Sequence, residues 1–217
     1  MTANLLKREN LLGFEQDEKE KFGIVDVVLI FIIAILLLSM VVQTYWLSPV
    51  KVDGSSMMQT LQHNDWLLID KTKTPNRGDV VVFVYSKNIN YIKRIIALPG
   101  DEIYSKNGVL YIIKNGSDIA EIIEEDYAYY MEDKPVGTYK DLSMKDIPHT
   151  VVGEGQMYVL GDNRWGSRDS REIGLVEMDS IIGVVPKWAI NKKEEYATYL
   201  NFIERLNNWF NNLFKRN

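Results

Sequence analysis

The stretch "DVVVFVYSKNINYIKRIIAL", residues Asp79 to Leu98, indicates the fold class. Valine, isoleucine and aromatic residues fill its two halves, 79–85 and 91–98, and Gly, Pro, Asn or Asp lie around each half. β-Branched and aromatic residues bounded by such turn formers are typical of β-strands. This part of the chain is therefore expected to be β-rich.

Further strand patterns continue on both sides of this stretch. "DWLLID" (65–70) precedes it, and "NGVLYII" (107–113) follows it behind an Asn-Gly turn, with a second Asn-Gly pair at 115–116. The two turns predict that Gly108–Ile113 belongs to a hairpin. "GQMYVLGD" and "SIIGVV" predict two more strands. The expected fold class is mainly β, with mixed and bent strands in one domain.

An apolar segment near the N-terminus predicts a membrane anchor. Residues 27–42 read "VVLIFIIAILLLSMVV", and with their flanks they form a run of about 24 residues that includes one acid, Asp26. A helix needs roughly 20 apolar residues to cross a bilayer. No face of the segment is polar, which argues against a buried core helix, and it ends in Tyr45 and Trp46, which suit a headgroup interface. A cleaved signal would have a shorter apolar region and a small-x-small site.

The charges around the anchor predict its orientation. Lys7, Arg8, Lys19 and Lys21 precede it, whereas only Lys51 follows it closely. By the positive-inside rule the N-terminus is cytoplasmic and the rest of the chain lies outside the cell membrane.

The last thirty residues have a helical pattern. Apolar residues recur at helical spacing on one face, and asparagine and glutamate fill the other. The apolar set is Tyr199, Phe202, Ile203, Leu206, Trp209, Phe210, Leu213 and Phe214. Such a helix either lies in the membrane interface or packs on its own domain or a second copy, and amphipathicity alone does not separate these alternatives.

These patterns divide the chain into four parts. The expected parts are an N-terminal cytoplasmic segment (1–22), a transmembrane anchor (23–47), an extracytoplasmic β-rich domain (48–186) and a C-terminal amphipathic helix (187–217). Within the third part, residues 101–155 are the least patterned and are expected to hold a small insertion.

Composition excludes several kinds of function. The 217 residues carry a net charge of −5 without a basic stripe, which argues against nucleic acid as a partner. The chain has no cysteine and two histidines, His63 and His149. Thiol catalysis, disulfides and thiolate or His-rich metal sites are therefore excluded, and no metal or cofactor is expected.

A serine hydrolase built from these residues needs a base other than histidine. Lysine can serve when burial lowers its pKa towards neutrality. Lys93 lies in the middle of a predicted strand, with Tyr91 and Ile95 on the same face. It is a candidate for such burial, although most strand lysines face solvent.

A third polar stretch, "GDNRWGSRDSREIG" (161–174), directly follows a predicted strand. Turn formation explains much of its composition, and Asp169 with Arg171 forms a candidate ion pair. The density of polar groups also suits a shell that holds a catalytic base in place.

Three stretches, in their order behind an anchor, resemble the bacterial type I signal peptidases of the Gram-positive-like branch. They are "GSSMMQTL", "YIKRIIALPGD" and "GDNRWGSRDSREIG", and "RGDVVVF" is similar to the family's intervening box. The resemblance covers residues 27–186. It implies a membrane-bound Ser/Lys serine endopeptidase with a bent β-sheet catalytic domain, whose partners are membrane lipid and the signal peptides of exported preproteins.

The resemblance assigns a role to each matching residue. Ser56, directly before Met57, matches the nucleophile, and its backbone N–H matches a donor of the oxyanion hole. Lys93 matches the general base. Ser167 matches the serine that orients the lysine, and Asp169 with Arg171 matches a supporting ion pair. Asp162, Asn163 and Arg164 belong to the same box. Gly54 occupies the position where some members have a serine donor; with Met57 it is a candidate for contact with substrate.

One position departs from the family pattern Ser-Met-x-Pro-Thr-Leu, because Gln59 replaces the proline. Proline fixes φ and restricts the residue before it, so Gln59 is expected to loosen the turn after the nucleophile. Two alternatives to a general signal peptidase stay open: a specialised processing peptidase of the same family, and a non-catalytic, membrane-anchored binding relative.

Overall fold

The computed structural model describes residues 23–107, 109–130 and 146–214. The expected cytoplasmic segment 1–22 and part of the expected insertion, 131–145, lie outside the described residues. The chain divides into two compact units, Met1–Met40 and Val41–Asn217. The first holds most of the N-terminal helix, and the second holds the β domain and the C-terminal helices.

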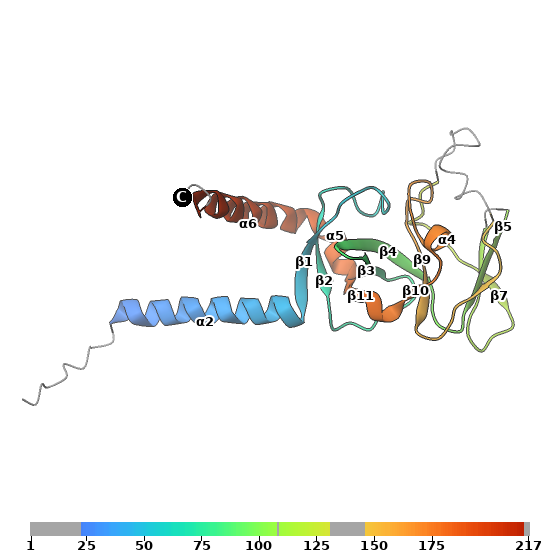
Figure 1. Cartoon of the computed structure of the whole chain (residues 1–217), viewed down its shortest axis with the longest axis horizontal. Helices are drawn as coiled ribbons and strands as arrows, with labels where there is room; N and C mark the ends of the chain where they lie inside the picture. The colour runs from blue at the N-terminus through green and yellow to red at the C-terminus, as the bar shows by residue number, and fades with distance from the viewer. Residues whose placement is uncertain (1–22, 108, 131–145, 215–217) are drawn as a thin grey trace, which may run out of the picture. The chain divides into compact units, whose positions relative to one another are not determined.

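Helix α2, Ile24–Tyr45, lies within the predicted anchor segment, 23–47 (Figure 1). Its 22 residues extend about 33 Å at 1.5 Å per residue. The stretch Ile24–Val42 is long and apolar enough to cross a membrane, judged by length and composition. The Gly23 N–H donates to Asp26 Oδ2 at 2.8 Å, so the one acid of the segment satisfies a backbone donor at the start of the helix.

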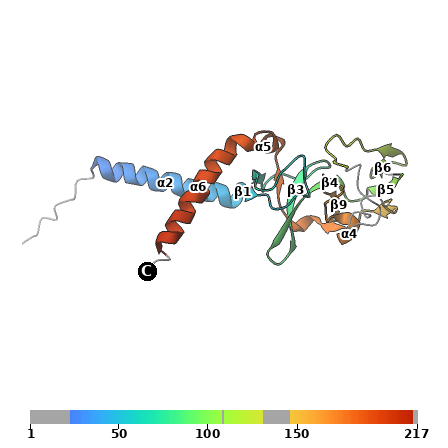
Figure 2. The same cartoon turned by 90° about the horizontal axis from the view of Figure 1, so that it is seen from above.

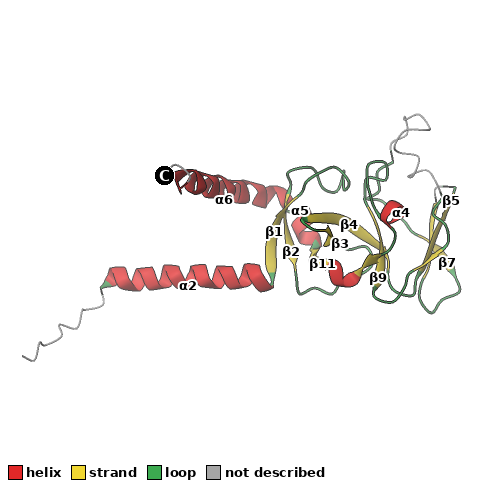
Figure 3. Cartoon of the chain, in the orientation of Figure 1, coloured by secondary structure: helices red, strands yellow, loops and turns green. Residues whose placement is uncertain are grey.

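A seven-stranded sheet forms the larger part of the β domain (Figure 3). Its strands lie in the order β1-β2-β11-β3-β4-β9-β10, and each neighbouring pair is antiparallel. The predicted mainly β fold is thus confirmed. The strands are β1 (Leu47–Lys51), β2 (Trp66–Asp70), β3 (Val80–Ser86), β4 (Ile89–Ala97), β9 (Gln156–Leu160), β10 (Val176–Glu177) and β11 (Ile181–Val185).

The register of this sheet shifts at three places, between Val84 and Ser86, between Ile95 and Ala97, and between Ile181 and Gly183. Such irregularities increase local twist and bend a strand. They account for the bent strands that the sequence predicts.

A second sheet has four strands in the order β7-β6-β5-β8. Its strands, β5 (Glu102–Lys106), β6 (Val109–Ile113), β7 (Ala120–Ile122) and β8 (Thr150–Val151), all fall within 101–155, the weakly patterned segment. β5 and β6 pair across the first Asn-Gly turn and β6 and β7 across the second. Figures 1 and 2 show this sheet at the end of the β domain away from β1.

Short helices complete the domain. α4 (Ser170–Ile173) and a 3₁₀ turn (Met178–Ser180) lie between β9 and β11. Two helices, α5 (Lys187–Asn191) and α6 (Lys193–Phe214), replace the single C-terminal helix that was expected.

The core of the larger sheet reaches the segment that carries the candidate nucleophile. Met57 and Leu61 are buried with Leu67 and Ile69 of β2 and Val82 of β3. Met57 is 1% exposed, so its side chain belongs to this core. Burial of this methionine fixes the backbone directly after Ser56.

Candidate active site

Asn163 holds the turn that carries Ser56. Its backbone N–H donates to the Ser56 carbonyl at 3.0 Å, and its side-chain amide donates to the Ser55 carbonyl at 3.0 Å. The Leu61 N–H closes the turn on the Met57 carbonyl at 2.8 Å. Gln59, at the family's proline position, is exposed, and the Met58–Gln59 peptide bond is cis.

The side chain of Lys93 reaches Ser56 from β4. Its Nζ donates to Ser56 Oγ at 2.7 Å and to the Ile92 carbonyl at 2.8 Å. The Tyr91 ring lies 4.9 Å from the same nitrogen. Lys93 is 3% exposed, which agrees with the burial expected from its apolar neighbours.

Burial of the Lys93 amine lowers its pKa to about 8. Desolvation disfavours the ammonium form and is the largest effect. The carboxylates of Asp169 and Asp162 oppose it, and the Arg171 guanidinium adds to it. A substantial fraction of this amine is therefore neutral near physiological pH, as a general base requires.

Asp169 and Arg171 form the expected ion pair at the start of α4. Arg171 donates to the carboxylate through Nε at 2.8 Å and Nη2 at 2.7 Å. The Gly161 N–H donates to the same carboxylate at 2.9 Å. Burial raises the pKa of Asp169, but the bonds and charge of Arg171 outweigh it, so the net pKa is below the usual value. The carboxylate is thus kept charged, and its charge acts on the Lys93 amine.

Asp162 pairs with Arg94, a residue that the sequence pattern did not single out. Arg94 donates to the Asp162 carboxylate through Nε at 2.8 Å and Nη2 at 2.6 Å, and both side chains are buried. The Thr60 hydroxyl donates to the same carboxylate at 2.5 Å. Thr60 lies in the turn after Ser56, and Arg94 is the neighbour of Lys93 on β4. The Asp162 carboxylate, which binds both, therefore joins the turn after the nucleophile to the strand that carries the base.

Ser167 lies against Gly161 and the backbone of Ser56. A Cβ added to Gly161 would lie 2.5 Å from the Ser56 carbonyl oxygen and closer still to Ser167 Oγ, so only glycine fits there. The buried Ser167 hydroxyl lies near the Asp169 carboxylate and helps to lower its pKa. Lys93 Nζ donates to Ser56 and Ile92, and among the described residues the expected bond between Lys93 and Ser167 is not formed.

Arg164, in the polar stretch 161–174, binds residues of the segment Glu125–Tyr130, which the sequence patterns did not single out. Its buried guanidinium pairs with Glu125, at 2.6 Å from Nη1 to Oε2, and donates to the Tyr130 hydroxyl at 3.0 Å. The Tyr129 N–H donates to the Asp162 carbonyl at 2.7 Å, and the Arg164 N–H donates to the Tyr129 carbonyl at 3.0 Å. No local pattern predicts these contacts, because they join residues more than thirty positions apart.

A cleft of about 380 Å³ opens at the Ser56–Lys93 pair. Gly54 lies in its wall with a φ of +101°, and its N–H donates to His63 Nδ1 at 3.2 Å. His63 is exposed and is not bonded to Ser56. Its other lining residues are Val50, Lys51, Val52, Asp53, Ser55, Met57, Val82, Asn90, Tyr91, Ile92, Gly166 and Arg168. The wall beside the Ser56 hydroxyl therefore combines apolar side chains with charged and polar ones.

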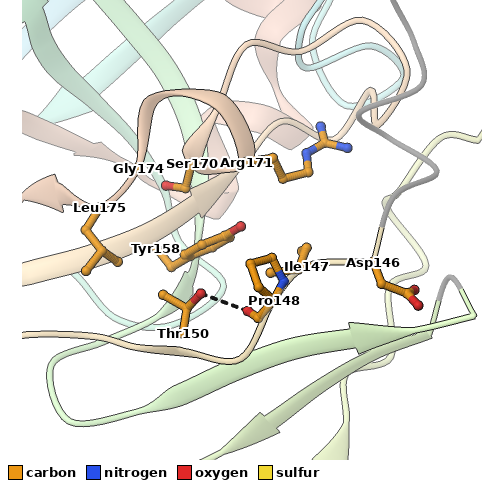
Figure 4. A pocket seen from close by; sticks show the side chains of 9 residues that line it. All are labelled: Asp146, Ile147, Pro148, Thr150, Tyr158, Ser170, Arg171, Gly174 and Leu175. Atoms are coloured by element: carbon orange, nitrogen blue, oxygen red, sulfur yellow. Dashed lines mark hydrogen bonds between the residues drawn. The ribbon is translucent and has the colours of Figure 1, made fainter.

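A second cavity, of about 320 Å³, lies beside α4 (Figure 4). Tyr158, Ile147, Pro148 and Leu175 make its wall mainly apolar, with Arg171 at its edge. It includes neither Ser56 nor Lys93. Among residues 23–107, 109–130 and 146–214, no cluster of acidic and histidine side chains is arranged to hold a metal ion.

Comparisons with known proteins show which family this chain resembles. A sequence model of the family described as "Signal peptidase, peptidase S26" matches residues 24–188. Signal peptidase IB of Staphylococcus aureus is 36% identical over 152 residues, which cover 67% of this chain and 78% of that protein. Signal peptidase I of Bacillus caldolyticus is 37% identical over 139 residues, which cover 62% of this chain and 74% of that protein. A solved signal peptidase I structure from Enterococcus faecalis is 32% identical and covers 52% of this chain and 98% of its own, with a TM-score of 0.40.

Proposed function

Because the chain belongs to the signal peptidase family, peptidase S26, and is a serine endopeptidase, we propose that it removes signal peptides from exported preproteins with a Ser56–Lys93 dyad. The observation that supports the dyad best is the 2.7 Å hydrogen bond between a half-buried hydroxyl and a buried amine whose pKa is about 8.

In the proposed first step, the neutral Lys93 amine accepts the Ser56 proton while Ser56 Oγ attacks the scissile carbonyl carbon. The Ser56 backbone N–H stabilises the oxyanion. No side-chain donor comes from Gly54. The Lys93 ammonium then protonates the leaving amine as the C–N bond breaks, and an ester of Ser56 remains.

In the second step, Lys93 accepts a proton from a water molecule that attacks this ester, and returns a proton to Ser56 Oγ. Ser167, whose buried hydroxyl lies beside the Ser56 backbone, orients Lys93 in the reacting state. Asp169 and Arg171 position Gly161, and Asp162 with Arg164 positions the same loop. These four act through other groups and touch no reacting atom.

The substrate is an extended segment bound in the cleft, with Gly54 and Met57 in its wall. Gly54 leaves room for the peptide backbone because it has no side chain. The anchor α2 places the domain on the membrane, with the N-terminus cytoplasmic and the cleft on the outer side, where signal peptides emerge. Tethering both enzyme and substrate to one membrane raises their effective concentration.

The test is cleavage of a signal-peptide-bearing preprotein by the full chain in detergent or vesicles. Ser56→Ala and Lys93→Ala are each expected to abolish cleavage, since one removes the nucleophile and the other removes the base. Ser55→Ala and the exposed Lys87→Ala are the matched controls and are expected to keep activity. Turnover by either dyad variant would exclude this mechanism, and binding without cleavage by the wild type would favour a non-catalytic relative.

A further inference from the structure

Helix α6 contacts the β domain through polar side chains. Asn201 Oδ1 accepts a hydrogen bond from Trp66 Nε1 at 2.9 Å, and Glu204 accepts one from Lys51 Nζ at 3.0 Å. Lys193 Nζ donates to Asp65 at 2.7 Å. At 100° per residue these three helix positions lie on one side. The side of α6 that faces β1 and β2 thus includes these three polar contacts.

The opposite side of α6 exposes large apolar side chains. Phe202 is 57% exposed, Leu206 37% and Trp209 57%. Their spacing of four and three residues aligns them along the helix in what we call the apolar stripe. A surface helix of a water-soluble domain normally turns such a stripe towards its core. Here the stripe is exposed instead, so it is directed to a medium or partner outside the domain.

Chain connectivity places this helix close to a membrane. β1 begins at Leu47, two residues after the end of the anchor helix, and has five residues. Its ends are therefore about 14 Å apart at ~3.4 Å per residue. The last residue of β1 is Lys51, whose amine binds Glu204 in the middle of α6. This ion pair keeps α6 within a short distance of the point where the chain leaves the anchor.

We propose that the apolar stripe of α6 inserts into the lipid–water interface of the bilayer, as a second attachment of the β domain beside the anchor. Tryptophan and phenylalanine on one side of a helix with polar residues on the other are characteristic of interfacial helices. The short chain connection between the anchor and β1, together with the ion pair from Lys51 to Glu204, favours lipid over a second copy. This inference concerns membrane contact and does not depend on the catalytic mechanism.

The chain contains no cysteine, so single labels can be placed in the full-length protein. Phe202→Cys and Trp209→Cys, each labelled with an environment-sensitive fluorophore, report on the stripe. Asn208→Cys, an exposed position on the polar side of the same helix, is the matched control. Each protein is reconstituted in vesicles of phosphatidylcholine and phosphatidylglycerol, with or without brominated acyl chains.

Labels at positions 202 and 209 are expected to show blue-shifted emission and quenching by brominated lipid, whereas the label at 208 remains unquenched. Equal quenching at the three positions, or none at 202 and 209, overturns the proposal. Disulfide-linked dimers of unlabelled Phe202→Cys, formed at a yield that persists on dilution with lipid, would assign the stripe to a second copy and also overturn it. Circular dichroism of each variant verifies that the helix is retained.

Discussion

The amine of Lys93 and the hydroxyl of Ser56 lie 2.7 Å apart although 37 positions separate them in the chain. Two independent supports produce this distance. Antiparallel pairing with β3 and β9 fixes β4, and Asn163 fixes the turn of Ser56. This arrangement determines both the pH dependence of cleavage and the free energy of unfolding, and both quantities can be measured.

The rate of cleavage is expected to rise with pH through about 8 and to level off above it. Only the neutral amine can accept the Ser56 proton, and the Lys93 pKa is about 8. Below that pH the rate should fall about tenfold per pH unit. The measurement is kcat/KM against pH on a model preprotein. A rate that is constant between pH 6 and 9, or that falls as pH rises to 8, contradicts the assignment.

Asp169→Asn and Arg171→Gln are expected to move this pH dependence in opposite directions. The Asp169 charge raises the Lys93 pKa and the Arg171 charge lowers it. Removing the first shifts the rise in rate to lower pH, and removing the second shifts it to higher pH. Lys114→Gln, at an exposed surface ion pair in the second sheet, is the control and should leave the profile unchanged. Shifts of equal sign would show that another group titrates.

Lys93→Met is expected to be inactive yet more stable than the wild type at pH 7. The folded-state pKa of about 8 is below the ordinary lysine value of 10.5, so folding penalises the ammonium by about 3 kcal/mol. This penalty is fully present below pH 8 and disappears as pH rises from 8 to 10.5. Loss of the bond to the Ile92 carbonyl offsets about 1 kcal/mol. Relative to Lys93→Met, the wild type should therefore gain stability as pH rises from 8 to 10.5.

Thermal unfolding of the detergent-solubilised chain at pH 7 and pH 10 measures this difference. The exposed Lys106→Met is the control, and its stability should follow that of the wild type at both pH values. A Lys93→Met variant that is less stable than the wild type at pH 7 would show that the amine does not destabilise the fold.

Gly161→Ala is expected to lose most activity and about 1–3 kcal/mol of stability, because the added methyl group displaces Ser167 or the Ser56 carbonyl. Gly155→Ala is a stringent control: it has a φ of +71° and no atom within 4 Å of the added Cβ. It should cost about 1 kcal/mol through strain and keep its activity. Comparing kcat and the unfolding temperature of the two variants separates displacement of the site from general destabilisation.

Local sequence patterns predict the elements that carry the dyad. The anchor, β2, β3, β4, β9 and β11 all fall within or beside predicted segments, because their composition alternates or runs apolar over several residues. β1 was missed because its five residues follow the anchor directly, and β7, β8 and β10 are too short to have a pattern.

Contacts between distant residues were not predictable in this way. The sequence patterns assign no role to Arg94, and its partner Asp162 lies 68 positions away. Glu125 lies in an unpatterned segment, yet it neutralises the buried Arg164. Such pairs depend on the folded arrangement of loops, about which strand propensity says nothing. The polarity of the α6 side that meets the β domain was unpredictable for the same reason.

Lys93 and Arg94 are adjacent on β4 and have different partners. The titrating amine of Lys93 binds Ser56, whereas the permanently charged guanidinium of Arg94 binds Asp162. A slip of this strand by one residue would exchange them and leave a group that never gives up its proton beside Ser56. Molecules in which β4 is misaligned would therefore not cleave substrate. Correct alignment of β4 is therefore a condition for proteolysis by the proposed dyad.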